Sequence, residues 1–144
     1  WELTSFLAEV MRIDSVDSYF PEKCAYHDSC SGLRELGIRE QPRKLLSLVK
    51  GLSLAELDEP DVCCGFGGTF SVKYPEISIR LVSNKVSDLE QTSADVLLGG
   101  DLGCLLNIAG RLRREGSATK VFHIAEVLAG MADGPGIAEP EDEV

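Results

Sequence analysis

The chain has 144 residues, 44% of them hydrophobic, and a formal net charge of −10. This length suits a single domain. The excess of 24 acidic over 14 basic residues argues against nucleic acid as a partner, because a phosphate-binding surface carries the opposite charge. No apolar run approaches the ~18–20 residues of a membrane span and no secretory signal pattern is present, so a cytoplasmic protein without a membrane span is expected.

Hydrophobic periodicity predicts helices and strands that alternate along the chain. The first eleven residues place Leu3, Phe6, Leu7 and Val10 on one face of an expected helix. The elements expected after it are a strand over 22–28, a helix over 41–51, a strand over 52–57, a helix over 75–93, a strand over 94–100, a helix over 101–116, a strand over 119–124 and a helix over 124–131. The buried faces expected for the two long helices consist of Ile79, Val82, Val86 and Leu89 in the first and Leu102, Leu105, Leu106, Ala109 and Leu112 in the second.

Alternating strands and helices predict an α/β fold, a small Rossmann-like layer structure in which helices flank a mainly parallel sheet of about four strands. The closing stretch, Asp133–Val144, ends in "GIAEPEDEV", which has four carboxylates and no periodicity. We expect residues 133–144 to form an acidic disordered tail and residues 1–132 to form the domain.

Five cysteines are an odd number, and nothing marks the chain as secreted, so metal binding or redox chemistry is favoured over a disulfide framework. Cys24 lies inside the first expected strand and is interpreted as a core residue. The other four follow strands: Cys30 the first, Cys63 and Cys64 the second, and Cys104 the third. Because parallel strands end at the same edge of a sheet, these four thiols are expected to converge there.

Four convergent thiolates suit an iron–sulfur cluster or a tetrahedral zinc ion. Adjacent cysteines bind neighbouring irons of one cluster more naturally than they bind one zinc ion. In "DVCCGFGG" the glycines would let the backbone turn tightly, and their N–H groups could hydrogen-bond cluster sulfides. We expect the backbone N–H groups of Gly65, Gly67 and Gly68 to make these hydrogen bonds. His27, near the same edge, is expected to tune the cluster as well.

These residues have two other interpretations. The "GFGG" turn is similar to a dinucleotide-binding loop, but Phe70 occupies the place of the third glycine. A nucleophilic cysteine paired with His27 or His123 would use one thiol and leave three unexplained. A metal-free interaction module, in which the cysteines have no function, is a further alternative.

The cysteine spacing resembles the cysteine-rich CCG domain family, whose pattern is Cys, a long gap, Cys-Cys-Gly, a long gap and Cys-x-x-Cys. Here 32 residues separate Cys30 from Cys63, and 35 separate Gly65 from Asp101. The family includes a component of heterodisulfide reductase, the glycolate oxidase iron–sulfur subunit and lactate-utilisation proteins. The segments "YHDSCSGLRELGIREQP", "CCGFGGTFSVKYPEIS", "GGDLGCLLNIAGRLRREG" and "VFHIAEVL" are most similar to the lactate-utilisation protein A group.

The resemblance implies a role in one-electron transfer, as a component of an L-lactate-oxidising complex and not as a self-contained enzyme. Members of that group carry two cysteine-rich halves, and this chain looks like the C-terminal one. The expected partners are the missing N-terminal cysteine-rich half and the other subunits of the complex.

One position departs from the fullest family motif. Asp101 stands where that motif has the first cysteine of Cys-x-x-Cys, so a [4Fe–4S] cluster is favoured over the five-cysteine noncubane cluster. Its ligands would be Cys30, Cys63, Cys64 and Cys104, and zinc bound by the same four thiolates is the alternative. Asp101 itself is expected to cap a helix, with ligation through its oxygen as the alternative.

Overall fold

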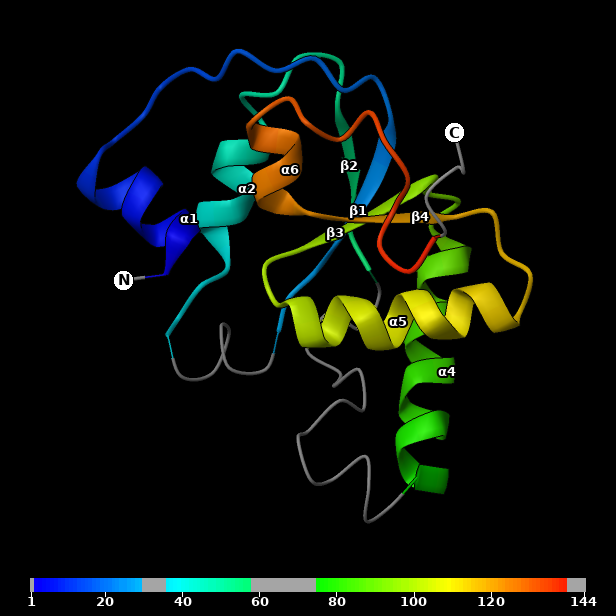
Figure 1. Cartoon of the computed structure of the whole chain (residues 1–144). Coiled ribbons are helices and arrows are strands. Elements are labelled where there is room, and N and C mark those ends of the chain that lie inside the picture. Colours follow the sequence, from blue (N-terminus) through cyan, green and yellow to red (C-terminus); the bar gives the residue numbers. More distant parts are fainter. Residues whose placement is uncertain (1, 30–35, 58–74, 140–144) are drawn as a thin grey trace.

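The computed structural model describes residues 2–29, 36–57 and 75–139, which build a four-stranded sheet with helices on both faces (Figure 1). The strand order is β2-β1-β3-β4, and all three pairings are parallel. The strands are β1 (Lys23–His27), β2 (Ser53–Ala55), β3 (Val96–Gly99) and β4 (Lys120–His123). The predicted α/β, Rossmann-like class is therefore confirmed.

The helices occupy the predicted places between the strands. They are α1 (Leu3–Ser5), which continues into the π-helical turn η1 (Phe6–Val10), then α2 (Glu40–Leu46), α4 (Pro75–Gln91), α5 (Leu102–Arg114) and α6 (Ile124–Leu128). α2 ends earlier than predicted because Lys50 pairs with the segment before β1: its N–H donates to the Ser18 carbonyl, and its own carbonyl accepts from Phe20. No helix in the described ranges is both long and apolar enough to cross a membrane.

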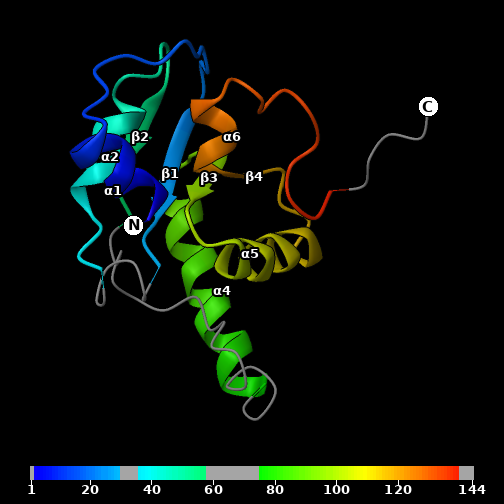
Figure 2. The same ribbon diagram turned by 60° about the vertical axis from the view of Figure 1, so that its left-hand side comes forward.

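Successive strand residues face opposite sides of the sheet and build two cores. Ala25, Leu97 and Val121 pack with α4 and α5 on one face. The strand residues that alternate with these pack on the other face, which α2 and α6 cover, as Figures 1 and 2 show for the helices. These inner residues are Cys24, Tyr26, Val96, Leu98 and Phe122. Both faces of the sheet are thus covered, as expected for parallel strands with near-continuous apolar sequence.

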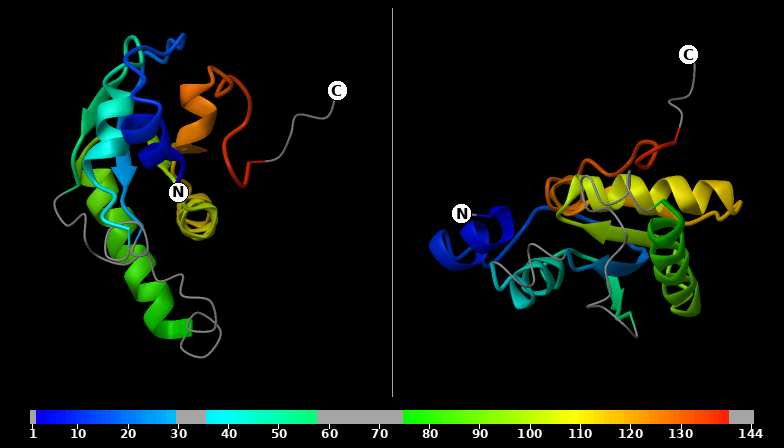
Figure 3. Two further views of the ribbon diagram at one scale, coloured as in Figure 1. Left: turned by 90° about the vertical axis from the view of Figure 1, so that its left-hand side faces the viewer. Right: turned by 90° about the horizontal axis from the view of Figure 1, so that it is seen from below.

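The predicted apolar face of the first helix is wrong. Leu3, Phe6 and Val10 are exposed, whereas Thr4, Ser5 and Ala8 are buried. The Glu2 carboxylate caps this helix by accepting from the Ser5 N–H, and the following turn is π-helical, with a Met11 N–H to Phe6 carbonyl bond. The wider turn changes the angle between successive side chains, so a spacing of 3.6 residues no longer identifies the buried side. Figure 3 shows this helical segment beside α2, away from α4.

The predicted faces of the two long helices are correct in part. Val82, Val86 and Leu89 of α4 are buried, but Ile79 is exposed. Two residues of the face predicted for α5, Leu102 and Leu106, are exposed, and the buried stripe consists of Cys104, Leu105, Ile108, Ala109 and Leu112. α5 has apolar residues on two adjacent stripes, and packing against the sheet selects the stripe that contains Cys104.

The segment after α6 runs alongside β4. The Ile137 N–H donates to the Val121 carbonyl at 2.8 Å, and its side chain packs against the core formed with α4 and α5. The Glu139 carboxylate accepts from the Gly136 N–H at 2.6 Å. The chain after Glu139 lies outside the described residues, so the disordered tail and the boundary at residue 132 stay predictions.

Candidate metal centre

The strand order places a ligand-binding position between β1 and β3. The chain adds β2 on one side of β1 and then adds β3 on the other side. The order of the strands therefore reverses between β1 and β3. In open parallel sheets, ligands bind outside the carboxyl ends of the strands at such a reversal. His27 and Gly99, which are register partners, end β1 and β3 there (Figure 1).

Cys104 lies in the first turn of α5, which begins directly beyond the end of β3. Its side chain is buried, with 7% of the residue exposed, on the face of the sheet covered by α4 and α5. The Asp101 side chain caps this helix by accepting from the Cys104 N–H at 3.2 Å, which confirms the expected capping role.

The buried His27 side chain has no hydrogen-bond partner among the described residues. The residue is 1% exposed, and neither ring nitrogen has a hydrogen-bond partner within the described ranges. Such a group costs about 1–3 kcal/mol when it is left unsatisfied, so the His27 imidazole is suited to a hydrogen bond with a group outside the described residues, either another part of the chain or a bound ligand. Alternation along β1 assigns His27 to the same face as Ala25, which is the Cys104 face.

Gly99 lets α5 approach this edge closely. A Cβ atom at this position would lie 2.8 Å from Leu105 Cδ2 and 3.4 Å from the His27 carbonyl oxygen. The absent side chain therefore allows the first turn of α5, with Cys104, to lie against the ends of β1 and β3. A buried thiol shares one face with a buried imidazole whose ring nitrogens have no partner among the described residues, and side chains of these two kinds suit a soft metal group.

The other predicted site residues lie outside the described residues. They are Cys30, Cys63, Cys64, Gly65, Gly67 and Gly68. The segments that carry them follow β1 and β2, which end at the same edge as β3. Within the described part of the chain, no group of three His, Cys, Asp or Glu side chains could hold a metal ion. Convergence of the four thiols stays a prediction.

Cys24 lies apart from this edge, as predicted. It is fully buried on β1 among the residues that contact α2 and α6. Burial, with smaller contributions from the carboxylates of Glu22 and Asp95, raises the pKa of its thiol to about 12. The Sγ–H donates to the Glu22 carbonyl at 3.6 Å. A thiol in this state is protonated at neutral pH and unsuited to metal ligation.

We expect Cys24 to resist alkylation in the folded protein. The reactive species is the thiolate, which burial disfavours. Iodoacetamide at neutral pH should leave Cys24 unmodified, and the same reagent in guanidinium chloride should modify it, as read by peptide mass spectrometry. Modification of Cys24 at equal rates under both conditions would show that this part of the core opens readily.

His123 has a structural role. It caps α6: ring atom Nδ1 accepts from the Ala125 N–H at 3.1 Å, and the backbone N–H of His123 donates to Glu126 Oε2 at 2.8 Å. Nε2 donates to the Gly100 carbonyl at 3.2 Å, which fixes the tautomer. Both ring nitrogens are occupied, so His123 does not serve as a base for a cysteine nucleophile.

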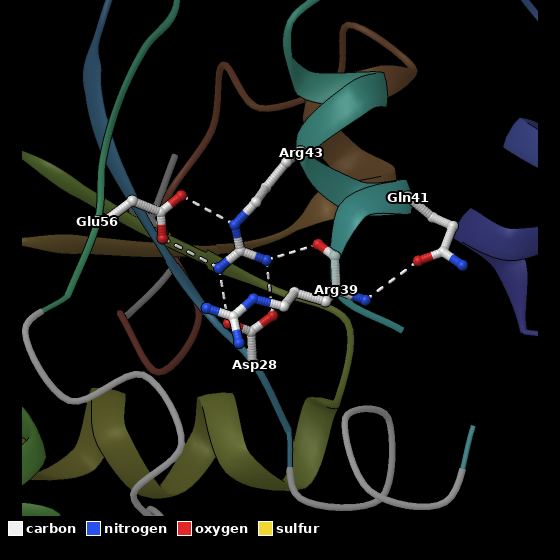
Figure 4. A network of polar contacts seen from close by, with 5 residues as sticks. All are labelled: Asp28, Arg39, Gln41, Arg43 and Glu56. Carbon is white, nitrogen blue, oxygen red and sulfur yellow. Dashed lines mark hydrogen bonds and ion pairs between the residues drawn. The ribbon is translucent and has the colours of Figure 1, made fainter. Parts of the chain in front are cut away.

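Sequence reasoning missed an arginine that connects the ends of two strands (Figure 4). Arg43 of α2 forms a bidentate pair with Asp28, the first residue after β1, at 2.6 and 2.9 Å. It also contacts Glu56, the first residue after β2, at 2.8 and 3.1 Å. The bond to Asp28 is the main cause that raises the pKa of Arg43, and the bond to Arg43 lowers the pKa of Glu56. The available signal was an acidic residue directly after each strand, in "YHD" and "LAE", with an arginine between them.

The lowered pKa of Glu56 predicts a pH-dependent contribution to stability. A carboxylate whose pKa is lower in the folded state stabilises the protein above its unfolded pKa, near 4.5, and this contribution is lost as the pH falls through the folded value. The Glu56 side chain is 54% exposed, so we expect only about 0.2–1 kcal/mol. Urea unfolding of wild type and Glu56→Gln should differ at neutral pH and converge as the pH falls from 4.5 through the folded pKa of Glu56. A constant difference would refute the linkage.

These features define an α/β protein with a ligand-binding edge at the carboxyl ends of a parallel sheet. The profile of the cysteine-rich domain with the CCG motif matches residues 24–109, and the chain belongs to this family. The match extends from β1 to the middle of α5 and so includes the edge described above.

Two similar proteins are named "Lactate utilization protein A". The one from Oceanobacillus iheyensis is 48% identical over 138 residues, covering 96% of this chain and 56% of that protein. The one from Bacillus subtilis is 51% identical over 128 residues, covering 89% of this chain and 54% of that protein. The chain thus spans about half the length of the curated relatives it matches.

Solved structures are similar only at a low level. The A domain of carboxylic acid reductase from Segniliparus rugosus, in complex with AMP and a co-purified carboxylic acid, is 18% identical, with a TM-score of 0.37. The alignment covers 97% of this chain and 23% of that one. This score is too low to support an argument about function.

Proposed function

We propose that this chain is an iron–sulfur domain that transfers single electrons within an L-lactate-oxidising assembly. The structural observation that carries the proposal is the buried His27 imidazole, which lacks a partner in the described residues and lies at the ligand-binding edge. Family membership supports it, because the family is defined by cysteines of the kind found on the segments that leave this edge. A cluster would supply the soft, hydrogen-bond-accepting partner that the site lacks.

The proposed ligands of a [4Fe–4S] cluster are the thiolates of Cys30, Cys63, Cys64 and Cys104. Such a cluster, when bound, supplies one-electron redox chemistry. The protein groups around it would set the potential through hydrogen bonds to sulfur. An N–H of His27 would donate one such bond, and the backbone N–H groups of Gly65, Gly67 and Gly68 would donate others. Asp101 would hold Cys104 in place through its cap.

The substrate and the partners are inferred from the relatives. Proteins that are about 50% identical over most of this chain carry lactate utilisation in their names. The chain matches only about half of their length, so we propose that it works together with an N-terminal cysteine-rich half and with the other subunits of a lactate oxidation complex. In this role it is a component of an oxidoreductase, and we propose that it acts in the cytoplasm.

Anaerobic reconstitution tests the proposal. The chain should take up about four iron atoms and about four sulfides, as a [4Fe–4S] cluster requires. It should absorb broadly in the visible range, and reduction should give an electron paramagnetic resonance signal. Stoichiometric zinc without iron, together with an absence of visible absorption, would replace the redox proposal with a structural zinc site. Wild type that binds neither metal would refute both.

A further inference from the structure

Arg43 connects two chain segments that the sheet itself leaves unconnected. Backbone pairing between β1 and β2 stops at the Ala25–Ala55 pair. Beyond that pair, β1 continues to His27 along β3 only. The segments that leave β1 and β2 toward the cysteines therefore start without a shared backbone ladder.

The Arg43 guanidinium connects the two segments, and all of its N–H groups take part in hydrogen bonds. Nη1 and Nη2 donate to the two carboxylate oxygens of Asp28, and Nε and Nη2 donate to those of Glu56. Nη1 also donates to the Arg39 carbonyl at 2.6 Å. These five bonds match the five N–H donors of a guanidinium, as Figure 4 shows. The group also lies over the Tyr26 ring, with Cζ 5.6 Å from the ring centroid.

The two carboxylates lie close to the predicted ligands along the chain. Asp28 is two residues before Cys30, and Glu56 is seven residues before Cys63. The Asp28 side chain is 1% exposed and that of Arg43 is 13% exposed, so this ion pair is shielded from water. Because the planar guanidinium binds each carboxylate through two hydrogen bonds, it fixes the distance between Asp28 and Glu56. A lysine ammonium lacks this planar geometry and cannot do so.

We propose that Arg43 is a positioning residue that holds the two cysteine-bearing segments in place at their first residues, before any metal binds. This proposal deepens the proposed function and rests on it for the identity of the ligands. Arg43 acts on the cluster through Asp28 and Glu56 and does not need to touch it. Pre-arranged segments lower the ordering cost of cluster assembly and slow its loss.

The test compares four variants of this chain. Arg43→Met removes the connection, and Arg43→Lys keeps the charge but not the fork. Glu56→Gln weakens only the link to β2, at a carboxylate exposed enough that folding should survive. Arg111→Met is the matched control, because Arg111 pairs with Glu115 at the end of α5 and, within the described residues, has no ion pair with Asp28 or Glu56.

Hydrogen exchange of the metal-free protein gives the first readout. In Arg43→Met, peptides that begin at Asp28 and at Glu56 should exchange faster, with a smaller effect in Glu56→Gln and none in Arg111→Met. The second readout is the rate of cluster loss to a chelator at matched folded fraction, which should rise about 10-fold or more in Arg43→Met, the scale typical of outer partners of a metal site. Arg43→Lys should rescue this rate only in part. The electron paramagnetic resonance line of the reduced Arg43→Met cluster should broaden, which a general loss of stability would not cause.

The outcomes separate this proposal from the proposed function. If wild type binds no cluster, the proposed function fails on its iron count, and metal-free exchange still decides whether Arg43 holds the segments. If Arg43→Met does not fold, Glu56→Gln decides by the same two readouts. Unchanged exchange at both segments overturns the proposal, and so does faster exchange with an unchanged rate of cluster loss.

Discussion

Cys104→Ser is expected to abolish stable cluster binding while leaving the fold intact. Serine has nearly the same size as cysteine, so the packing of α5 against the sheet should change little. The lost thiolate removes one of four proposed ligands, and the fall in iron affinity should exceed the ~10–100-fold typical of losing an outer partner of a metal site. Iron content after reconstitution and desalting measures the loss, and circular dichroism measures the fold.

Cys24→Ser is the matched control for this result. Both cysteines are buried, but Cys24 lies on the opposite face of the sheet, and burial raises its pKa. Iron content should therefore stay at the wild-type value in Cys24→Ser. Cys30→Ser, Cys63→Ser and Cys64→Ser should behave like Cys104→Ser. Equal iron loss in Cys24→Ser and Cys104→Ser would mean that the effect comes from disturbed packing and not from ligation.

The strands and most helices could be predicted from local sequence. "ADVLLGG" is a short apolar run closed by glycines, and its centre is the fully buried β3. The face of a helix was harder to predict where apolar residues form more than one stripe. In α5, Leu106 fits the predicted stripe as well as Leu105 does, yet Leu106 is exposed and Cys104 is buried. The choice between stripes depends on how the helix lies on the sheet, which periodicity does not contain.

The place of Cys104 at the start of α5 was predictable from the sequence, but its contacts and those of its neighbours were not. That Cys104 and Asp101 follow β3 could be read from the chain, because strand ends follow from the pattern. The Arg43 network depends on β1 and β2 being neighbours, which is a property of strand order. His27 and His123 both end strands, but only the structure shows that His123 caps a helix while the His27 imidazole has no partner in the described part of the chain.

His27→Leu is expected to stabilise the metal-free domain and to weaken its hold on the cluster. The imidazole is 1% exposed, and its nitrogens lack partners in the described part of the chain, so replacing it with an apolar side chain of similar volume removes a desolvation cost. The gain should be about 1–3 kcal/mol in the free energy of unfolding, measured by urea denaturation under reducing, metal-free conditions. If the imidazole donates to cluster sulfur, the same change should speed cluster loss to a chelator and shift the midpoint potential.

His123→Leu is the comparison variant, and its stability is expected to change in the opposite direction to that of His27→Leu. The substitution is identical, but His123 uses both ring nitrogens and caps α6, so its loss should destabilise the metal-free domain by about 0.5–2 kcal/mol. Stability changes of opposite sign at the two histidines would show that His27 is retained at a cost to the apo fold. A histidine that destabilises the metal-free fold would then be explained by its role in binding. If both variants lose stability equally, the His27 imidazole is satisfied without the cluster, and the structural observation behind the proposed function no longer supports it.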